Sequence, residues 1–282
     1  MLNNIQSILR LHSQQLQQTL NLDLQSARID VQCLLQSALQ VNHAYLLTHP
    51  EWCLDDEQYV RYTTLFERRL CGEPIAYLLG EREFFGLNFS VSPATLIPRP
   101  ETELLVELAL QRIPTQGEFR VLDLGTGSGA IALSIAYHRP DIEVVAVDQS
   151  VAALEIAKNN AQKLDLKNVR LLHSDWFVAL QGERFDMIVS NPPYIAVDDL
   201  HLAQGDLRFE PSTALVVGGD GLDDIRHICS QAKKYLNEYG WLLFEHGYNQ
   251  ASAVRAILQQ ESFSSVFSDV DLAGIERVSG GN

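Results

Sequence analysis

The residues with the clearest chemical potential in this chain come directly after FDMIV, an apolar run typical of a buried strand. They read Asn191-Pro192-Pro193-Tyr194. The side-chain oxygen of Asn191 and the carbonyl oxygen of Pro192 both accept hydrogen bonds, and neither proline has an N–H group that competes for them. Two acceptors in a rigid turn can bind both hydrogens of a planar –NH2 group, on an amide or an amino-purine. The ring of Tyr194 is suited to lie against the flat face of that group.

An –NH2 group of this kind is a poor nucleophile, because its nitrogen lone pair is delocalised. Holding both N–H bonds can favour a tetrahedral nitrogen whose lone pair points at the methyl group of a sulfonium cofactor, which is catalysis by positioning and preorganised polar groups. Asn-Pro also initiates ordinary turns, and two prolines can simply end a strand. The position after the fourth strand of the predicted sheet, with an aromatic residue following, favours a reaction site.

A glycine-rich loop is the second candidate site. The strand-like run RVLDL leads into GTGSGA, from Gly125 to Ala130, and then into a predicted helix. Glycines let the backbone approach a ligand, and the start of the helix offers unpaired N–H groups. Asp148 closes the next strand, 23 positions after Gly125, where a carboxylate is suited to accept both hydroxyls of a ribose. We therefore predict an adenosine-containing cofactor at residues 123–130, although the loop fits dinucleotide-binding and methyltransferase patterns equally well.

A third group of candidate residues follows the third predicted strand, in the segment HSDWF. Asp175 can accept a hydrogen bond from an adenine amino group, and the indole of Trp176 can pack on the adenine ring. A tryptophan at the start of a helix is also a common core feature. Its place beside the glycine loop favours the adenine role.

Three parts of the chain must position these residues. Apolar residues at helical spacing predict a bundle of four or five short helices over residues 1–80, and the segment 81–99 reads as a β-hairpin and linker. From Pro100 onwards a helix is followed by apolar strands that alternate with amphipathic helices, including one helix over 222–236. This pattern predicts an α/β domain over 100–282, with a mostly parallel seven-stranded sheet covered on both faces and an antiparallel edge formed by the last two strands.

Composition limits the partners. The net charge is −15, and acidic residues outnumber basic ones in both halves of the chain, which argues against nucleic acid as the main partner unless a local basic patch exists. The four cysteines show neither a CxxC pair nor neighbouring histidines, so neither a zinc site nor a disulfide framework is predicted. Because no signal peptide or membrane-spanning run is visible, we expect a cytoplasmic protein and, by default, a monomer.

Five segments together resemble one enzyme family. NPPY at 191–194, DLGTGSGAIALSIA at 123–136, VDQS at 147–150, SDWF at 174–177 and IPRPETE at 97–103 are similar to the PrmC/HemK protein-glutamine N5-methyltransferases. The resemblance extends over essentially the whole chain, and IPRPETE is its most specific part. It implies a Rossmann-like methyltransferase domain that transfers a methyl group from S-adenosyl-L-methionine (AdoMet) to the glutamine of the Gly-Gly-Gln motif in class-1 peptide chain release factors.

The resemblance also implies roles for individual residues. The glycine loop, Asp148, Trp176 and the NPPY segment would form the site, with assistance from acidic residues whose separate roles stay open: Asp123, Asp175, Glu101 and Glu103. The implied cofactor-binding residues are Gly125, Thr126, Gly127, Ser128, Gly129, Asp148, Trp176 and Asn191. The implied substrate-binding residues are Asn191, Pro192, Pro193 and Tyr194, of which Asn191, Pro192 and Tyr194 are the catalytic candidates. The helical part, residues 1–80, is expected to dock the protein substrate.

Two other enzyme classes and a non-catalytic scaffold compete with this interpretation. A DNA or RNA adenine-N6 methyltransferase would use the same turn after the fourth strand, but it should carry a basic groove. An NAD-dependent oxidoreductase could use the glycine loop, but it gives no reason for the NPPY segment. A non-catalytic scaffold gives no reason for these motifs to occur together in one chain.

Overall fold

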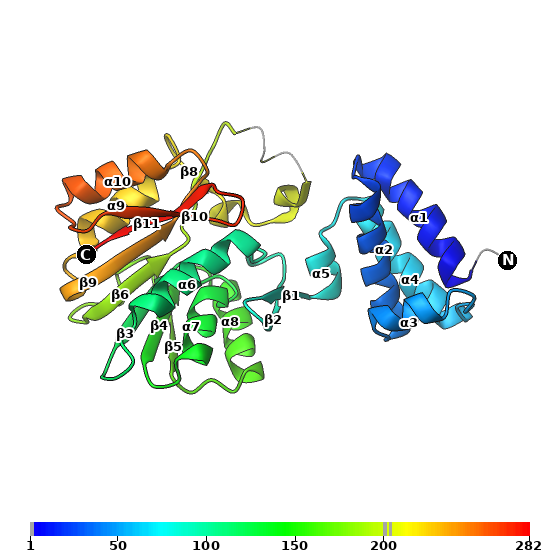
Figure 1. The fold of residues 1–282 in the computed structure, drawn as a ribbon, viewed down its shortest axis with the longest axis horizontal. Coiled ribbons are helices and arrows are strands. Elements are labelled where there is room, and N and C mark those ends of the chain that lie inside the picture. The colour runs from blue at the N-terminus through cyan, green and yellow to red at the C-terminus, as the bar shows by residue number, and fades with distance from the viewer. Residues whose placement is uncertain (1–2, 200–201, 203–204) are drawn as a thin grey trace. The chain divides into compact units, whose positions relative to one another are not determined.

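The computed structural model of the chain describes residues 3–199, 202 and 205–282, which form two compact units. The first unit comprises the described residues of Met1–Gly80 and Ala203–Phe209. The second comprises those of Glu81–Leu202 and Glu210–Asn282. The helices and strands of each are drawn in Figure 1.

The first unit is a helical bundle. Its first four helices begin where a polar side chain accepts the backbone N–H group three residues later. Asp55 accepts from Gln58 in this way, and the Gln58 side chain accepts from the Asp55 N–H in return. The core is a cluster of apolar side chains such as Val31, Leu35 and Phe66. The helices are α1 (Ile5–Leu20), α2 (Leu24–Leu39), α3 (His43–Thr48), α4 (Asp56–Leu70) and α5 (Ile75–Leu79).

A short 3-10 helix from later in the chain, η3 (Gly205–Phe209), belongs to this first unit. It meets the bundle at Arg69, which is buried in α4. The Arg69 guanidinium pairs with Asp30 of α2 at 2.8 Å (Nε to Oδ2) and with Asp206 of η3 at 3.8 Å (Nη1 to Oδ1). The helical unit is therefore assembled from two separate stretches of sequence.

The second unit has an α/β fold. Its sheet has the order β10-β11-β9-β6-β3-β4-β5, and β11 runs antiparallel to both of its neighbours while the other pairings are parallel. The fold class expected from the sequence is therefore confirmed. The strands of this sheet are β3 (Arg120–Leu124), β4 (Glu143–Asp148), β5 (Val169–His173), β6 (Phe185–Ser190), β9 (Leu236–Glu245), β10 (Phe267–Val270) and β11 (Glu276–Gly281).

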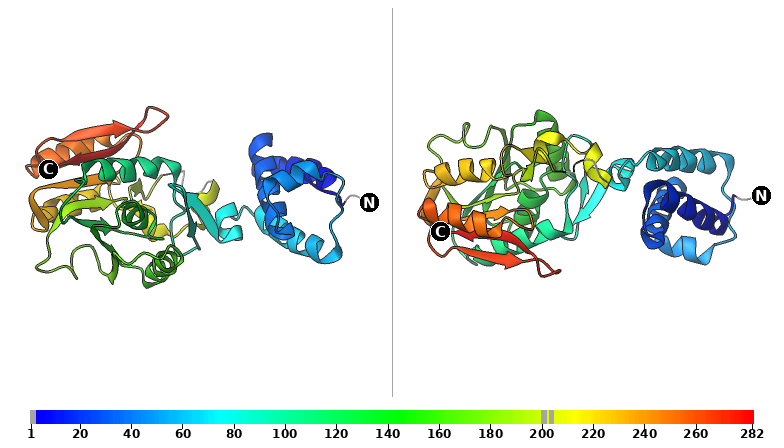
Figure 2. Two further views of the ribbon diagram at one scale, coloured as in Figure 1. Left: turned by 60° about the horizontal axis from the view of Figure 1, so that its bottom comes forward. Right: turned by 90° about the horizontal axis from the view of Figure 1, so that it is seen from above.

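Helices cover both faces of the sheet, as Figures 1 and 2 show. Successive strand residues point to opposite faces, so Val121 belongs to a core with α6 and α7, whereas Leu122 belongs to a core with α9 and α10. This double burial explains why the central strands β3, β4 and β6 read as largely apolar runs. The helices of this unit are η1 (Pro100–Thr102), α6 (Glu103–Arg112), α7 (Ala130–His138), α8 (Val151–Lys163), η4 (Ser212–Ala214), α9 (Asp223–Ala232) and α10 (Ala251–Gln260).

Two short sheets accompany the main one. Strands β1 (Glu81–Phe84) and β2 (Leu87–Ser90) form the expected hairpin around Gly86. Strands β7 (Ile195–Ala196) and β8 (Val216–Val217) form a parallel pair that the sequence did not predict. The helix expected over 222–236 is wrong at its end, because α9 stops at Ala232 and β9 already begins at Leu236, where it pairs with Phe185 of β6.

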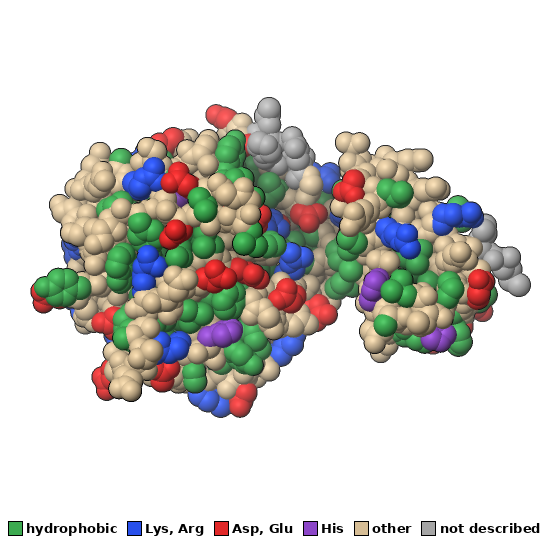
Figure 3. Space-filling view, viewed as in Figure 1, with side chains coloured by type: hydrophobic (Ala, Val, Ile, Leu, Met, Phe, Trp, Pro, Cys, Tyr) green, Lys and Arg blue, Asp and Glu red, His purple; other side chains and the backbone are tan. Residues whose placement is uncertain are grey.

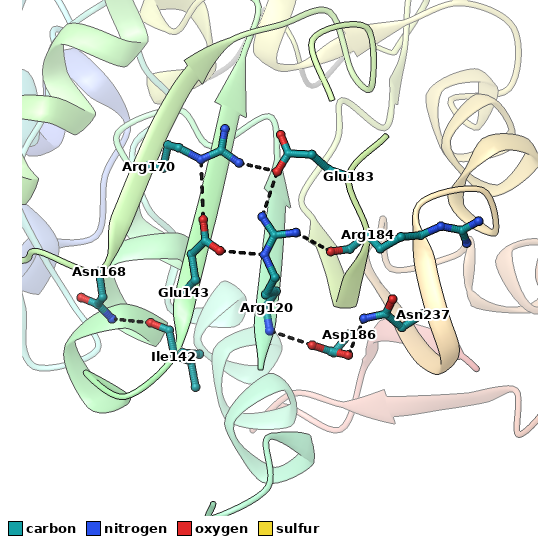
Figure 4. Close-up of polar contacts among 9 residues, drawn as sticks. All are labelled: Arg120, Ile142, Glu143, Asn168, Arg170, Glu183, Arg184, Asp186 and Asn237. Carbon is teal, nitrogen blue, oxygen red and sulfur yellow. Dashed lines mark hydrogen bonds and ion pairs between the residues drawn. The ribbon is translucent and has the colours of Figure 1, made fainter. Parts of the chain in front are cut away.

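An ion-pair network lies at the amino ends of the parallel strands, the edge opposite to the glycine loop (Figure 4). Arg120 of β3 binds Glu143 at 2.7 Å (Nε to Oε2) and Glu183 at 2.8 Å (Nη2 to Oε2), and it donates to the carbonyl of Arg184 at 2.6 Å. Arg170 of β5 binds the same two carboxylates. The network connects the starts of neighbouring strands and so supports their register.

Candidate functional site

A cavity in the second unit opens where β3, β4, β5 and β6 end. These carboxyl ends are where open α/β sheets bind ligands. The lining comes from segments that are far apart in sequence: Ala94, Thr95, Leu96, Pro98, Thr102, Gly125, Thr126, Gly127, Ser128, Ala130, Ile131, Asp148, Gln149, Ser150, Ala153, Ser174, Asp175, Trp176, Asn191, Pro193, Pro211, Thr213 and Ala214.

Most of the site residues expected from the sequence meet at this cavity, but three do not line it in the described part of the chain: Gly129, Pro192 and Tyr194. Pro192 is buried behind Asn191. Tyr194 lies behind the loop, and Gly129 begins α7. Asp175 and Trp176, the residues expected beside the adenine, both line the cavity.

The three glycines of the loop, Gly125, Gly127 and Gly129, are required for different structural reasons. All adopt positive φ angles, +75° at Gly125, +57° at Gly127 and +85° at Gly129, which glycine reaches without strain. A Cβ on Gly127 would meet no atom within 4 Å, so this residue faces the open cavity. A Cβ on Gly129 would lie 2.8 Å from Cδ1 of Leu133, so this glycine permits close packing inside the fold.

Asp148 holds the glycine loop through both of its oxygens. Oδ2 accepts the N–H of Gly127 at 2.8 Å, and Oδ1 accepts the N–H of Ser150 at 2.8 Å. Burial raises the pKa of Asp148, and the two backbone hydrogen bonds partly oppose this effect. Each carboxylate oxygen can accept a second hydrogen bond, so Asp148 retains acceptor capacity toward the cavity.

Asp123 supports the loop from below. It is completely buried at the end of β3, and its Oδ2 accepts the Thr126 hydroxyl at 2.7 Å. Burial raises its pKa to about 7. Asp123 does not line the cavity among the described residues, so its contact is with the loop itself.

Trp176 is held in an unusual backbone conformation. Its φ angle of +44° lies in the left-handed region, which is strained for a side chain of this size. The Ser174 hydroxyl stabilises this turn by donating to the Trp176 carbonyl at 2.8 Å and accepting the N–H of Ala179 at 3.0 Å. The indole passes 3.7 Å from the position of a Cβ on Gly125. The aromatic ring is thereby kept beside the glycine loop.

The NPPY loop is fixed by residues that follow it in the chain. The Gln250 side chain donates to the Tyr194 carbonyl at 3.0 Å, and the Ile195 N–H donates to the Leu215 carbonyl at 3.0 Å. Gly221 packs so closely that a Cβ there would lie 2.4 Å from the Tyr194 carbonyl oxygen. These contacts make the turn rigid and leave Asn191 at the cavity wall.

A buried polar cluster lies behind Asn191. Its Nδ2 donates to the Thr102 hydroxyl oxygen over a long 3.5 Å, and the Tyr194 hydroxyl donates to Oε1 of Glu245 over 3.4 Å. Glu245 ends β9 and is only 2% exposed. Burial raises its pKa to about 7, and it raises the pKa of Tyr194 as well. Glu245 was not predicted, because in the sequence it follows the apolar run WLLF as an ordinary strand end.

The IPRPETE segment serves both the cavity and the fold. Pro98 and Thr102 line the cavity. Arg99 pairs with Glu210 at 2.5 Å (Nη2 to Oε1), and Oε1 of Glu103 accepts the N–H of Phe85 at 2.8 Å. Of its two glutamates, Glu103 therefore fixes the β1–β2 hairpin turn, whereas Glu101 is exposed. The IPRPETE motif indicated this part of the cavity wall in the sequence. No sequence pattern indicated that Ala94, Thr95, Leu96, Pro211, Thr213 and Ala214 would also line the cavity.

The arrangement combines a loop suited to a nucleoside-containing ligand with an amide side chain at the end of the next strand. The space beside Gly127, the free acceptor capacity of Asp148 and the adjacent indole of Trp176 fit an adenosine-containing cofactor. In the described part of the chain, no cluster of His, Cys, Asp or Glu side chains could hold a metal ion.

Two family descriptions match the chain. Residues 101–220 match the Methyltransferase small domain, and residues 8–80 match the PrmC N-terminal domain. Solved structures with a similar fold include a 16S rRNA methyltransferase from T. Thermophilus (24% identity, TM-score 0.54, covering 72% of this chain and 49% of that one) and a methyltransferase from Pyrococcus furiosus (19%, 0.53, 77% and 96%). At these identities the likeness concerns the fold.

Curated relatives are much closer in sequence. The release factor glutamine methyltransferase of Xylella fastidiosa is 51% identical over 254 residues, covering 90% of this chain and 92% of the relative. The enzyme of the same name from Salmonella typhimurium is 50% identical over 259 residues, covering 92% and 93%. The one from Burkholderia pseudomallei is 53% identical, covering 90% and 91%. The chain belongs to the family of release factor glutamine methyltransferases.

Proposed function

We propose that this chain transfers a methyl group from AdoMet to the side-chain amide nitrogen (N5) of the glutamine in the Gly-Gly-Gln motif of class-1 peptide chain release factors. Relatives that match almost end to end and are half identical carry the name of this activity. The structural observation that carries the proposal is that Asn191 and the glycine loop line the same cavity. A donor of methyl groups and a planar amide can therefore meet there.

The cofactor part of the proposal rests on the loop between β3 and α7 and on its neighbours. We assign AdoMet to the cavity residues Gly125, Thr126, Gly127 and Ser128, with the ribose on Asp148 and the adenine beside Trp176. Gly129 stays an indirect contributor because it only permits the loop to pack. When bound, AdoMet supplies an electrophilic methyl group on a sulfonium centre.

The substrate part rests on the NPPY loop. Asn191 Oδ1, at the cavity wall, accepts one N–H bond of the glutamine amide, and Pro193 and Tyr194 keep it in a rigid turn. The Pro192 carbonyl is assigned the second N–H bond from the sequence alone, since Pro192 does not line the cavity in the described part of the chain. Holding both hydrogens favours the tetrahedral nitrogen that methyl transfer needs, so the rate gain comes from orientation and preorganised polar groups. Since the Tyr194 hydroxyl is directed to Glu245, its ring orientation is fixed before substrate binds.

The helical unit has a separate proposed task. A glutamine on a protein loop must be held by contacts outside the cavity, and we assign this docking to residues 1–80, with 81–99 as connector and 100–282 as the catalytic domain. Deleting residues 1–80 should abolish release-factor methylation and leave AdoMet binding largely intact. Unchanged methylation by the truncated chain would refute the docking role. We further propose a monomer that acts in the cytoplasm. As a separate finding, none of the described helices is long and apolar enough to cross a membrane.

Methylation of a nucleobase is the competing activity, since the NPPY turn would serve an adenine amino group equally well. The net charge of −15 argues against a nucleic-acid substrate. On the face drawn in Figure 3, the described Lys and Arg side chains are scattered among Asp and Glu. This distribution gives no support to a phosphate-binding track on that face.

One experiment separates the two activities. The purified protein receives radiolabelled AdoMet together with a class-1 release factor, the same factor with its Gly-Gly-Gln glutamine changed to alanine, or duplex DNA. Label on the unaltered release factor alone supports the proposal. Label on the alanine variant assigns another acceptor residue, and label on DNA assigns the competing activity.

A further inference from the structure

Part of the cavity wall comes neither from the glycine loop nor from the strand ends. Residues of the stretch 94–98, before η1, form one portion of it, and residues of the segment 211–214 form another. The segment 211–214, which contains η4, is called the wall segment below. Because it is far from 94–98 in the sequence, contacts between distant residues must hold it at the cavity.

Main-chain hydrogen bonds hold the end of the wall segment. The Leu215 carbonyl accepts the N–H of Ile195 at 3.0 Å, and Ile195 pairs with Val216 in the short parallel sheet. The end of the wall segment is thereby joined to the residues that follow the NPPY loop. The start of the segment cannot be held through a main-chain donor of its own, because Pro211 has no N–H group.

An ion pair lies at this start. Arg99 and Glu210 are 111 residues apart in the sequence and meet at 2.5 Å (Nη2 to Oε1). Each is adjacent to a residue that lines the cavity, since Arg99 follows Pro98 and Glu210 precedes Pro211. The Glu210 side chain is completely buried, whereas the Arg99 side chain is 29% exposed. A buried carboxylate is costly without a cationic partner, so this pair ties two portions of the cavity wall together.

Neighbouring prolines limit the backbone freedom of both partners. Arg99 lies between Pro98 and Pro100 and is extended, with a φ angle of −100° and a ψ angle of 144°. Glu210 precedes Pro211, and a residue before proline likewise favours an extended backbone. With little freedom at either residue, the ion pair fixes the start of the wall segment relative to Pro98.

We propose that the ion pair between Arg99 and Glu210 is a clasp that positions the wall segment and thereby sets the affinity of the cavity for AdoMet. The inference rests on the proposed function, because it takes AdoMet to occupy this cavity. Neither partner lines the cavity in the described part of the chain, so both are positioning residues that act through Pro98 and Pro211. Both belong to the second unit.

A double variant breaks the clasp without leaving a buried charge. Removing one partner alone would leave the other charge unpaired and could unfold the chain. Arg99→Met/Glu210→Gln removes both charges and keeps similar side-chain volumes. If the wall segment is then in place for about a tenth of the time, the apparent Kd for AdoMet rises about tenfold.

Two milder variants test the same contact. Arg99→Lys keeps a cation that can reach Glu210, so its Kd should stay within about threefold of the unaltered protein. Glu210→Asp keeps the charge but shortens the side chain by one methylene, so its Kd should rise at least about threefold. Glu210→Asp also supplies the test if the double variant does not fold.

The matched control is Arg120→Met at the opposite edge of the sheet, where Arg120 also pairs with carboxylates. The Kd for AdoMet is measured by calorimetry and the stability by the thermal midpoint. Arg120→Met should lower the midpoint and leave the Kd unchanged. In release-factor methylation, the double clasp variant should raise KM for AdoMet about tenfold and keep kcat at saturating AdoMet within about threefold, as for loss of a binding contact made equally before and during reaction.

An unchanged Kd in the folded double variant, or in Glu210→Asp if the double variant does not fold, would overturn the clasp. A fall in kcat with unchanged KM would also overturn it, because the pair would then act on the methyl-transfer step. A rise in Kd with Arg99→Lys and Arg120→Met unaffected supports it. If the unaltered protein binds AdoMet but methylates no release factor, the proposed function is wrong, and the comparison of Kd values alone decides the clasp.

Discussion

Changing Gly127 to alanine tests whether the open side of the glycine loop is where the cofactor lies. The Gly127 φ angle of +57° is in the left-handed region, and a Cβ there meets no atom within 4 Å. The only expected cost to folding is therefore the backbone strain of an L residue in this region, about 1–2 kcal/mol. The added methyl group would point into space that the cavity needs for a ligand.

The hairpin offers a matched control. Gly86 has a φ angle of +75° and also no atom within 4 Å of a Cβ, but it does not line the described cavity. Gly86→Ala should lower the free energy of unfolding by the same ~1–2 kcal/mol as Gly127→Ala. Gly129→Ala should lower it further, because its Cβ would lie 2.8 Å from Leu133 Cδ1.

The assays are denaturant unfolding without ligand and calorimetric titration with AdoMet. We expect Gly127→Ala to weaken AdoMet binding at least tenfold, about 1.4 kcal/mol, whereas Gly86→Ala binds like the unaltered protein. Equal affinities for both variants, with equal losses of stability, would mean that the ligand does not approach Gly127. In that case the assignment of AdoMet to this loop would be wrong.

Three other predictions address the remaining parts of the site and the sheet. Asn191→Ala should lower the turnover of release-factor methylation at least ~10²–10³-fold. Near-normal turnover in a steady-state assay would show that Asn191 does not hold the glutamine amide. Asp148→Ala should weaken AdoMet binding by about 1.5–3 kcal/mol, the range for hydrogen bonds to a charged group, and an unchanged calorimetric affinity would place the ribose elsewhere. Arg120→Ala should cost about 1–2 kcal/mol of unfolding free energy, since Arg120 pairs with two partly exposed carboxylates, and should leave AdoMet affinity unchanged; a change in affinity without a change in stability would contradict a purely structural role.

The sequence predicted what depends on short stretches of chain. The central strands β3, β4 and β6 were visible because both of their faces are buried. The glycine loop and Asp148 were visible because strand, loop and acid follow one another directly. Asn191 and the glycine loop line the same cavity, as expected. They do so because β3 and β6 are parallel neighbours, so the residues that follow them lie at the same edge of the sheet.

What the sequence did not predict depends on contacts between distant segments. Glu245 lies behind Tyr194 only because β9 pairs with β6 in one particular register, and no local pattern specifies that register. The early end of α9 has a similar cause: Leu236 is apolar and fits a helix pattern, but its pairing with Phe185 places it in a strand. The pairing of Ile195 with Val216 joins segments too short to give a signal of their own.

The inclusion of η3 in the helical unit affects the order in which that unit is completed during synthesis. Residues up to Gly80 leave the ribosome before η3 does, and this stretch already contains Asp30, the 2.8 Å partner of Arg69. Asp206 is made more than a hundred residues later, and its 3.8 Å contact with Arg69 is long and partly exposed. The bundle can therefore fold before η3 exists, and η3 adds afterwards to a preformed surface.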